Sequence, residues 1–310
     1  MSDTLLQVED IRVRFPVKGG FVHALDGVSL DVRAGETVAV VGESGCGKTT
    51  LARAILGLQP FEGGSIRLGG RSVQGVEKGQ ASRVGMVWQD PYASLDPKWR
   101  VGKSVIEPLL IAGRHEPIEG LLQDVGLDPA LASRYPHQLS GGQRQRVAIA
   151  RALALAPPLV ICDEPTAALD LSIQAQVLNL LKDLQAELGC AYLYISHDLL
   201  TVRFLADRIA VMYLGRIVEE GPTAEVFRCP RHPYTKALLE SSPSIETLGQ
   251  LPEAAKGELP DPTTRFVGCR FAGRCPKAQD LCLERDPAVQ AVGDVRVWCH
   301  FPEADSLGST

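Results

Sequence analysis

Gly42-Glu43-Ser44-Gly45-Cys46-Gly47-Lys48-Thr49 is the most informative stretch of this chain, because it matches the phosphate-loop pattern G-x-x-x-x-G-K-[ST] at every position. The preceding residues, 37–41, are apolar and mostly β-branched, which is typical of a buried parallel strand. Residues 50–56 predict a helix that ends at Gly57. The alternative is an ordinary glycine turn before a helix. The order of strand, glycine loop and helix favours a nucleoside triphosphate site.

The chemistry expected of this loop follows from its residue types. Glycines allow successive backbone N–H groups to turn toward a phosphate at the positive end of the helix. Lys48 is expected to reach the β- and γ-phosphates, and the Thr49 hydroxyl is expected to bind Mg²⁺. We count Thr50, the next residue, among the nucleotide-binding residues.

The composition is that of a globular protein with an acidic balance. The chain has 310 residues, of which 45% are hydrophobic and 22% charged, and its formal net charge is −5. This charge argues against a nucleic-acid surface, which is usually basic. No apolar run approaches the ~20 residues of a membrane-spanning helix. Residues 1–10 lack a basic segment followed by an apolar core, so no export signal is expected.

Polar residues follow three further apolar segments that read as core strands. A carboxylate after such a strand is the usual Mg²⁺-directed partner of a phosphate loop, and the next acid can orient or deprotonate the attacking water. Two exposed acids at a strand end, and a structural histidine, are the alternatives. The residues are Gln89 after 84–88, Asp163 and Glu164 after 159–162, and His197 after 191–195.

A second candidate anion site begins at Leu139-Ser140-Gly141-Gly142-Gln143, directly before a predicted helix over residues 144–156. Its serine and two glycines stand at the positive end of that helix. One nucleotide does not need two such sites, so we expect this one to contact a nucleotide held by another subunit. Asp170 precedes a further amphipathic helix that ends at Gly189.

With these motifs in this order, residues 5–240 resemble the ATP-binding cassette (ABC) ATPases. The resemblance implies ATP and Mg²⁺ as ligands and a head-to-tail dimer. It implies that Phe15 stacks on adenine and that Gln89 contacts Mg²⁺. It also places Ser140–Gln143 in the family signature and Asp170 in the D-loop. Catalysis would rest on Glu164 as base, with His197, Lys48 and Gln89. A small-molecule kinase would leave the Leu-Ser-Gly-Gly-Gln run unexplained.

Three further runs narrow the resemblance to oligopeptide and dipeptide importers, namely residues 89–97, 213–219 and 231–239. It implies an ATPase subunit at the cytoplasmic face of the membrane, paired with a second, paralogous ATPase and two permeases. An external solute-binding protein would supply di- or oligopeptides. Nickel and glutathione importers share the pattern. A soluble ABC ATPase acting on DNA or ribosomes is disfavoured by the single cassette and the absence of a heptad run.

The expected fold is an α/β phosphate-loop (RecA-like) core with three additions. Alternating residues between 5 and 33 predict short antiparallel strands, which form a β subdomain. Residues 92–138 change to helical spacing and predict an inserted helical subdomain. We therefore assign 1–91 and 139–240 to the nucleotide-binding core, 92–138 to the helical insertion, and 241–310 to a small cysteine-rich C-terminal extension.

Four of the eight cysteines fall in this extension: Cys269, Cys275, Cys282 and Cys299. In a chain without an export signal they indicate a metal site more than a disulfide framework. Both zinc and an iron–sulfur cluster suit four thiolates, but the paired C-x2–4-C knuckles of zinc sites are missing. The peptide-importer resemblance implies a 4Fe–4S cluster. We expect a structural role, since metal ligation would offset the ordering entropy of so small a module.

Overall fold

The strand that precedes the phosphate loop lies inside the larger of two sheets in the computed structural model, which describes residues 4–76, 82–241, 259–261 and 263–303. The eight strands of this sheet run in the order β11-β12-β10-β9-β3-β8-β7-β6. Their bounds are β3 Thr37–Val41, β6 Val84–Val87, β7 Leu159–Asp163, β8 Ala191–Ser196, β9 Arg208–Tyr213, β10 Arg216–Pro222, β11 Gln290–Val292 and β12 Val295–Val297.

The five strands from β9 to β6 pair in parallel, and every residue of β3 is buried. The side chains of β3 divide between two cores: Val38 and Val40 pack on one face of the sheet, and Ala39 and Val41 on the other. This division explains the continuous apolar run of the sequence, because a parallel sheet covered on both faces needs apolar residues on both. The predicted core strands are confirmed here.

A second, four-stranded sheet is antiparallel and runs in the order β2-β1-β4-β5. The sequence predicts several short strands between residues 5 and 33, but the structure has two long ones, β1 (Thr4–Val17) and β2 (Gly20–Arg33). Register shifts interrupt their pairing at several points. Each shift changes which face the following side chains occupy, so the alternation breaks although the strand continues. The sheet is completed by β4 (Ser65–Leu68) and β5 (Arg71–Ser72).

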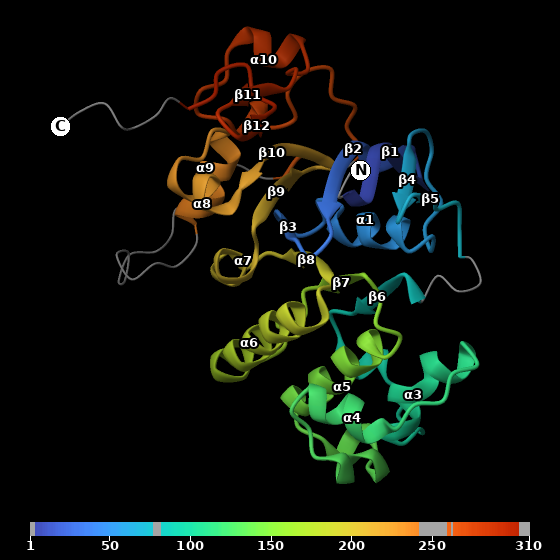
Figure 1. The fold of residues 1–310 in the computed structure, drawn as a ribbon. Coiled ribbons are helices and arrows are strands. Elements are labelled where there is room, and N and C mark those ends of the chain that lie inside the picture. The colour runs from blue at the N-terminus through green and yellow to red at the C-terminus, as the bar shows by residue number, and fades with distance from the viewer. Residues whose placement is uncertain (1–3, 77–81, 242–258, 262, 304–310) are drawn as a thin grey trace, which may run out of the picture.

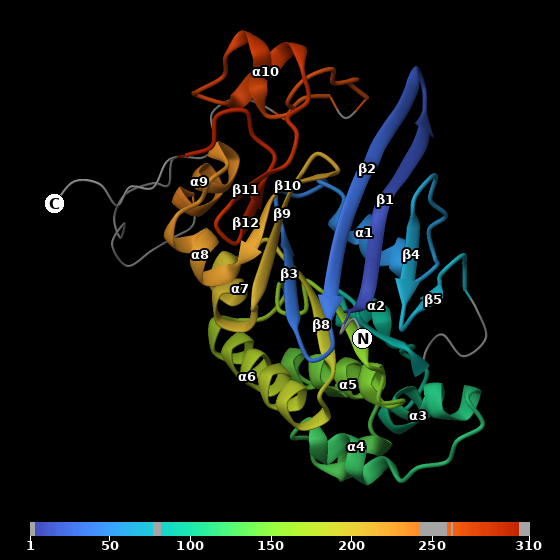
Figure 2. The ribbon, with the colours of Figure 1, turned by 45° about the horizontal axis from the view of Figure 1, so that its top comes forward.

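Helices flank the larger sheet, and α3, α4 and α5 gather at the end opposite the C-terminal extension (Figures 1 and 2). The segment predicted as a helical insertion, residues 92–138, contains α3, α4 and two 3-10 turns. The bounds are α1 Lys48–Ile55, α2 Pro91–Ser94, α3 Val101–Ile111, α4 Ile118–Asp124, α5 Gly141–Leu153, α6 Leu171–Leu188, α7 Leu199–Leu205, α8 Thr223–Arg228, α9 Pro233–Glu240 and α10 Asp280–Glu284, with 3-10 turns at Pro129–Ser133, Pro136–Gln138 and Ala272–Arg274. None of the helices in the described ranges combines the length and apolar content needed to span a bilayer.

The C-terminal extension continues the larger sheet. Strand β12 pairs antiparallel with β10 through Glu219 and Val297, and β11 pairs with β12. Figure 1 shows this region in red, over β10 and β9 and next to the β2 end of the antiparallel sheet. Residues 242–258, 262 and 304–310 of the predicted extension lie outside the described residues. The described part is thus joined to the core by backbone hydrogen bonds as well as by side chains.

Candidate active site

The site lies along one edge of the larger sheet, where its parallel strands end. The phosphate loop follows β3, Gln89 follows β6, Glu164 follows β7, His197 follows β8 and Leu214 follows β9. Because parallel strands have their carboxyl ends at the same edge, residues far apart in the sequence meet there. The structure therefore brings together the residues that the sequence identified separately.

The phosphate loop has the backbone conformation that its glycines permit. Gly42, Gly45 and Gly47 have φ values of 152°, 78° and 112°. A Cβ on Gly42 would lie 2.1 Å from the Met212 carbonyl oxygen, so this glycine is also required by space. The buried Lys48 side chain curls back over the loop and donates hydrogen bonds to the Gly42 and Glu43 carbonyl oxygens, at 2.8 and 3.1 Å. The ammonium group is thus held by two carbonyl oxygens of the loop.

A buried carboxylate lies beside the start of helix α1. Asp163 is 2% exposed, and its side chain is hydrogen bonded to Thr49. Burial raises the pKa of Asp163, and the hydrogen bond from Thr49 partly offsets that rise. A hydroxyl and a buried carboxylate next to the Lys48 ammonium form the oxygen-rich donor set that Mg²⁺ prefers. These residues fit a magnesium ion.

Glu164 connects the two other catalytic candidates that follow core strands, Gln89 and His197. Its carboxylate accepts a hydrogen bond from the Gln89 amide at 2.8 Å, and its other oxygen lies 3.1 Å from His197 Nδ1. The backbone of Glu164 has φ 47°, an uncommon value for a residue with a side chain, and its N–H donates to the Ile195 carbonyl at 2.8 Å. The 15% exposed carboxylate is therefore held in one place by two strands and two side chains.

These groups open into one cavity of about 540 Å³, except Asp163, which is not among its lining residues. It is lined by Val22, His23, Ala24, Ser44, Gly45, Gly47, Lys48, Thr49, Thr50, Gln89, Glu164, His197, Leu214, Thr264, Phe266 and Arg270. Most of the loop residues and all four predicted catalytic residues are among them. The remaining loop residues, Gly42, Glu43 and Cys46, support the cavity wall without lining it.

Phe15 is not among the lining residues. It lies on β1, where it pairs with Val22 of β2, and β2 is the strand of this sheet that contributes the wall. Its cross-strand neighbour Val22 lines the cavity, and the Phe15 side chain is 37% exposed. Stacking of Phe15 on adenine stays a prediction.

The signature segment and the D-loop lie side by side, away from this cavity. Ser140 and Gln143 form a reciprocal capping box at the start of α5, with N–H to oxygen distances of 3.2 and 3.0 Å. Asp170 caps α6 by accepting hydrogen bonds from Ile173 N and Ser172 Oγ. A Cβ on Gly142 would lie 2.6 Å from the Ile173 side chain, so the two helix starts are in direct contact.

An ion pair joins the phosphate loop to the C-terminal extension. Arg274 binds both carboxylate oxygens of Glu43, at 2.9 and 3.1 Å, and its side chain is only 8% exposed. This hydrogen-bonded pairing raises the pKa of Arg274. The Glu43 N–H donates to the Tyr234 hydroxyl at 3.0 Å. Glu43 is thus fixed from outside the loop by both its backbone and its carboxylate.

The four cysteines of the extension line one small cavity, together with Phe271 and His232. No disulfide joins any of the described cysteines. Burial raises the pKa of the Cys299 thiol to about 11, and neighbouring sulfurs contribute to that rise. Within the described residues, no three His, Cys, Asp or Glu side chains come close enough together to hold one metal ion. The four thiols therefore line the same cavity, but they are not placed as the ligands of one metal ion.

Sequence reasoning missed the contributions of the extension and of β2 to the site. Phe266 and Arg270 line the cavity, and Arg274 binds Glu43 of the phosphate loop. All three are more than 200 residues from that loop in the sequence. Nothing in their local pattern distinguishes them from ordinary surface or core residues. Their role depends on how the extension packs against β9 and β10, which a one-dimensional pattern does not specify.

Comparison with known proteins agrees with this geometry. The family model described as ABC transporter matches residues 25–167. A second model, the oligopeptide/dipeptide transporter C-terminal region, matches residues 218–282. Among solved structures, a dimeric ATP-binding cassette in a post-hydrolysis state with ADP and Pi is similar, with a TM-score of 0.64 and 30% identity over 70% of this chain and 98% of that one.

Curated relatives match nearly the whole chain. The Di/tripeptide transport ATP-binding protein DppF of Pseudomonas aeruginosa is 45% identical over 97% of this chain and 98% of its own length. The Dipeptide transport ATP-binding protein DppF of Escherichia coli is 42% identical over 98% and 96%. This chain belongs to the ABC transporter ATPases that carry an oligopeptide/dipeptide transporter C-terminal region.

Proposed function

We propose that this chain is the ATP-hydrolysing subunit of an ABC importer that takes up dipeptides or oligopeptides through partner permeases. The observation that supports ATP hydrolysis is the position of Glu164. Gln89 and His197 hold its carboxylate in the same cavity that the phosphate loop lines. The peptide cargo is supported by the match to the oligopeptide/dipeptide transporter region and by relatives named as dipeptide and di/tripeptide transport proteins.

The loop side of the cavity would bind the triphosphate. Lys48 exchanges the Gly42 and Glu43 carbonyl oxygens for phosphate oxygens, which needs no large movement because its Nζ already lies inside the loop. Thr49 and Asp163 would hold the magnesium ion, with Gln89 as a further contact on the far side. When bound, this ion supplies positive charge that stabilises the transferred phosphoryl group.

The opposite side of the cavity would handle the attacking water. Glu164 accepts the proton of that water, and Gln89 and His197 keep the carboxylate in position. His197 is 60% exposed, so it can also turn toward the γ-phosphate without leaving a buried partner unpaired. Positioning and charge, rather than covalent chemistry, would therefore account for hydrolysis.

The signature segment and the D-loop would complete the site of a second ATPase subunit. Residues 140–143 and Asp170 do not line the cavity of their own chain, yet they form one continuous surface at two helix starts. A head-to-tail partner would place its phosphate loop there, so that ATP closes the dimer. We propose that this partner is a paralogous ATPase. We also propose that the ATPase pair lies at the cytoplasmic face of the membrane and binds two permeases, to which an external solute-binding protein delivers the cargo. Nickel or glutathione is the alternative cargo.

We also propose that the extension holds a 4Fe–4S cluster with Cys269, Cys275, Cys282 and Cys299. The support is that four buried or half-buried thiols line one cavity. The preference for the cluster over zinc comes from the sequence, which lacks the paired C-x2–4-C knuckles of zinc sites and resembles the peptide importers.

The Glu164→Gln variant tests the assigned base. The amide keeps the shape of the carboxylate but does not accept a proton, so steady-state turnover should fall by at least about a hundredfold. Binding of ATP and nucleotide-dependent dimerisation should persist. The matched control is Glu187→Gln on the exposed side of α6, which should hydrolyse ATP at the wild-type rate. Retained turnover in Glu164→Gln would remove Glu164 from this role.

An affinity purification from membranes tests the importer assignment. The tagged full chain should bring down two polytopic permeases and a second cassette ATPase, identified by mass spectrometry. A solute-binding protein beside them would identify peptide, nickel or glutathione as cargo class. Recovery of ribosomal or DNA-repair proteins without a permease would contradict the assignment and leave only the ATPase chemistry.

Anaerobic purification tests the cluster. Iron and acid-labile sulfide should each approach four per chain, and substitution of Cys269 or Cys282 by serine should abolish both. The control Cys190→Ala, whose buried thiol lies outside the cavity, should retain them. Tightly bound zinc with no iron or sulfide would show that the cluster assignment is wrong.

A further inference from the structure

His232 lies in the run 231–239, none of whose residues lines the nucleotide cavity. It is 1% exposed and stands directly before α9, which it caps by accepting a hydrogen bond from the Tyr234 N–H at its Nδ1, at 3.0 Å. Its own backbone N–H donates to the buried Glu219 carboxylate of β10 at 2.8 Å. The imidazole is therefore fixed both through its backbone and through one ring nitrogen.

The cap decides which ring nitrogen carries the proton. A nitrogen that accepts a hydrogen bond from a backbone N–H uses its lone pair for it, so Nδ1 of His232 carries no hydrogen. The hydrogen of the neutral ring must then be on Nε2. Nε2 is buried, and no hydrogen-bond acceptor among the described residues contacts it. Buried donors without an acceptor are costly and uncommon, so this N–H indicates a further partner.

The His232 ring belongs to the wall of the cavity that the four cysteines of the extension line. It lies against the ring of Phe271, with centroids 5.8 Å apart. His300 also lines this cavity, but its Nε2 is 2.8 Å from the Arg285 carbonyl oxygen and donates there. Of the two histidines in the described part of the cavity wall, His232 is therefore the one with a ring N–H available to a group inside.

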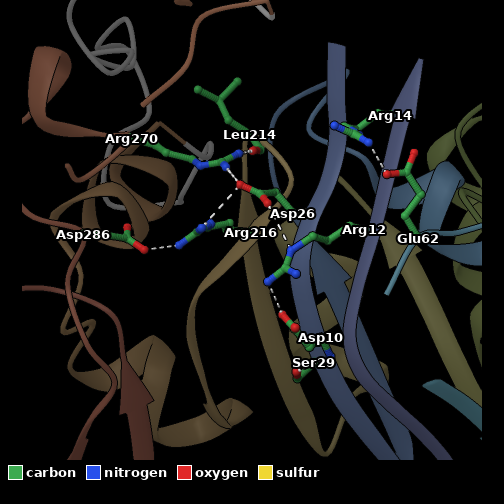
Figure 3. A network of polar contacts seen from close by, with 10 residues as sticks. All are labelled: Asp10, Arg12, Arg14, Asp26, Ser29, Glu62, Leu214, Arg216, Arg270 and Asp286. Carbon is green, nitrogen blue, oxygen red and sulfur yellow. Dashed lines mark hydrogen bonds and ion pairs between the residues drawn. The ribbon is translucent and has the colours of Figure 1, made fainter. Parts of the chain in front are cut away.

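The cysteine side of this cavity is attached to the core of the molecule. Arg270, the residue after Cys269, pairs with Asp26 on β2 and donates a hydrogen bond to the Leu214 carbonyl (Figure 3). Arg274, the residue before another cysteine of the cavity, binds the phosphate loop. The cysteines and His232 are thus attached to the same core, which fixes their positions relative to each other.

We infer that His232 donates its Nε2–H to a sulfur of the 4Fe–4S cluster in this cavity. The inference rests on the cluster proposed above. The thiolates and sulfides of such a cluster carry negative charge, and hydrogen bonds to them from outside the ligand set tune the cluster. His232 is not a ligand itself, because ligation through Nε2 would require a hydrogen on Nδ1, where the Tyr234 N–H already points.

This assignment gives the run 231–239 a function at two sites. The Tyr234 hydroxyl accepts the hydrogen bond from the Glu43 N–H of the phosphate loop, at 3.0 Å. His232, two residues earlier, lines the cysteine cavity. The first turn of α9 therefore contacts the phosphate loop with one side chain and the cysteine cavity with another.

A redox titration of the anaerobically purified full chain, followed by electron paramagnetic resonance, tests the inference. His232→Asn keeps the cap of α9, because an amide oxygen accepts from the Tyr234 N–H, but its side chain is too short to place a donor where Nε2 stands. The reduction potential should become more negative, because the lost N–H stabilises the additional negative charge of the reduced cluster. Iron and acid-labile sulfide should stay at the wild-type level.

His232→Gln is the matched variant. Its amide N–H reaches the position of Nε2, but its side chain no longer caps α9. Its reduction potential should stay close to the wild-type value, although its thermal unfolding midpoint should fall. The control His115→Asn, at an exposed position between α3 and α4, should match the wild type in both measurements.

Three results would overturn the inference and leave the cluster in place. The first is a wild-type potential in His232→Asn, which would mean that no sulfur accepts this hydrogen bond. The second is an equal shift in His232→Asn and His232→Gln, which would indicate a general disturbance of the fold. The third is loss of iron and sulfide from His232→Asn alone, which would make His232 a ligand. A wild-type chain without iron and sulfide would instead overturn the cluster and this inference together.

Discussion

The carbonyl oxygen of Ala24 lies so close to Gly47 and Gly215 that neither position has room for a side chain. A Cβ on Gly47 would lie 2.3 Å from it, and a Cβ on Gly215 would lie 2.8 Å from it. Both glycines have positive φ, which other residues adopt only with strain. The close approach lets β2, the phosphate loop and the turn after β9 touch one another through backbone. Hydrogen bonds from Gly215 N to Cys46 O and from Asp26 N to Gly215 O, at 2.8 and 2.9 Å, lock the arrangement.

The catalytic geometry depends on this arrangement because the same loop faces two sets of partners. On one side the parallel strands bring Gln89, Glu164 and His197 to the sheet edge. On the other side the loop meets β2 and the extension, through Glu43 and Arg274. Across the boundary with the extension, Arg274 and Glu43 pair in half-buried surroundings, where charge-assisted hydrogen bonds are stronger than at a fully exposed surface. The loop is therefore shaped from both sides before a nucleotide arrives.

Much of the fold and of the phosphate end could be predicted because the evidence is local in sequence. A buried strand, a glycine loop and a helix start are contiguous, and polar residues directly after core strands must meet at one sheet edge. The positions of Lys48, Glu164 and His197 follow from that rule. The long β1–β2 hairpin was not predicted, because its register shifts break the alternation that identifies strands.

The part of the cavity wall that β2 and the C-terminal extension contribute could not be predicted for a different reason. The sequence pattern does not show that residues 22–24 of β2 line the cavity. The cysteines were visible as a group, but their segment looked like an appended module. Its strand β12 instead joins β10, and the extension brings Arg270 and Phe266 to the cavity and Arg274 to Glu43 of the phosphate loop. Side-chain contacts over such distances in the chain leave no periodic trace in the sequence.

The claim on which these relations depend is that the C-terminal extension is a working part of the nucleotide site. A double-mutant cycle on Glu43 and Arg274, with ATP affinity as readout, tests it most directly. Arg274→Met and Glu43→Gln should each weaken ATP binding several-fold, because each releases the loop from the extension. The double variant should be no weaker than the worse single variant. Effects that simply add, or ATP affinities equal to wild type in both single variants, would contradict the claim.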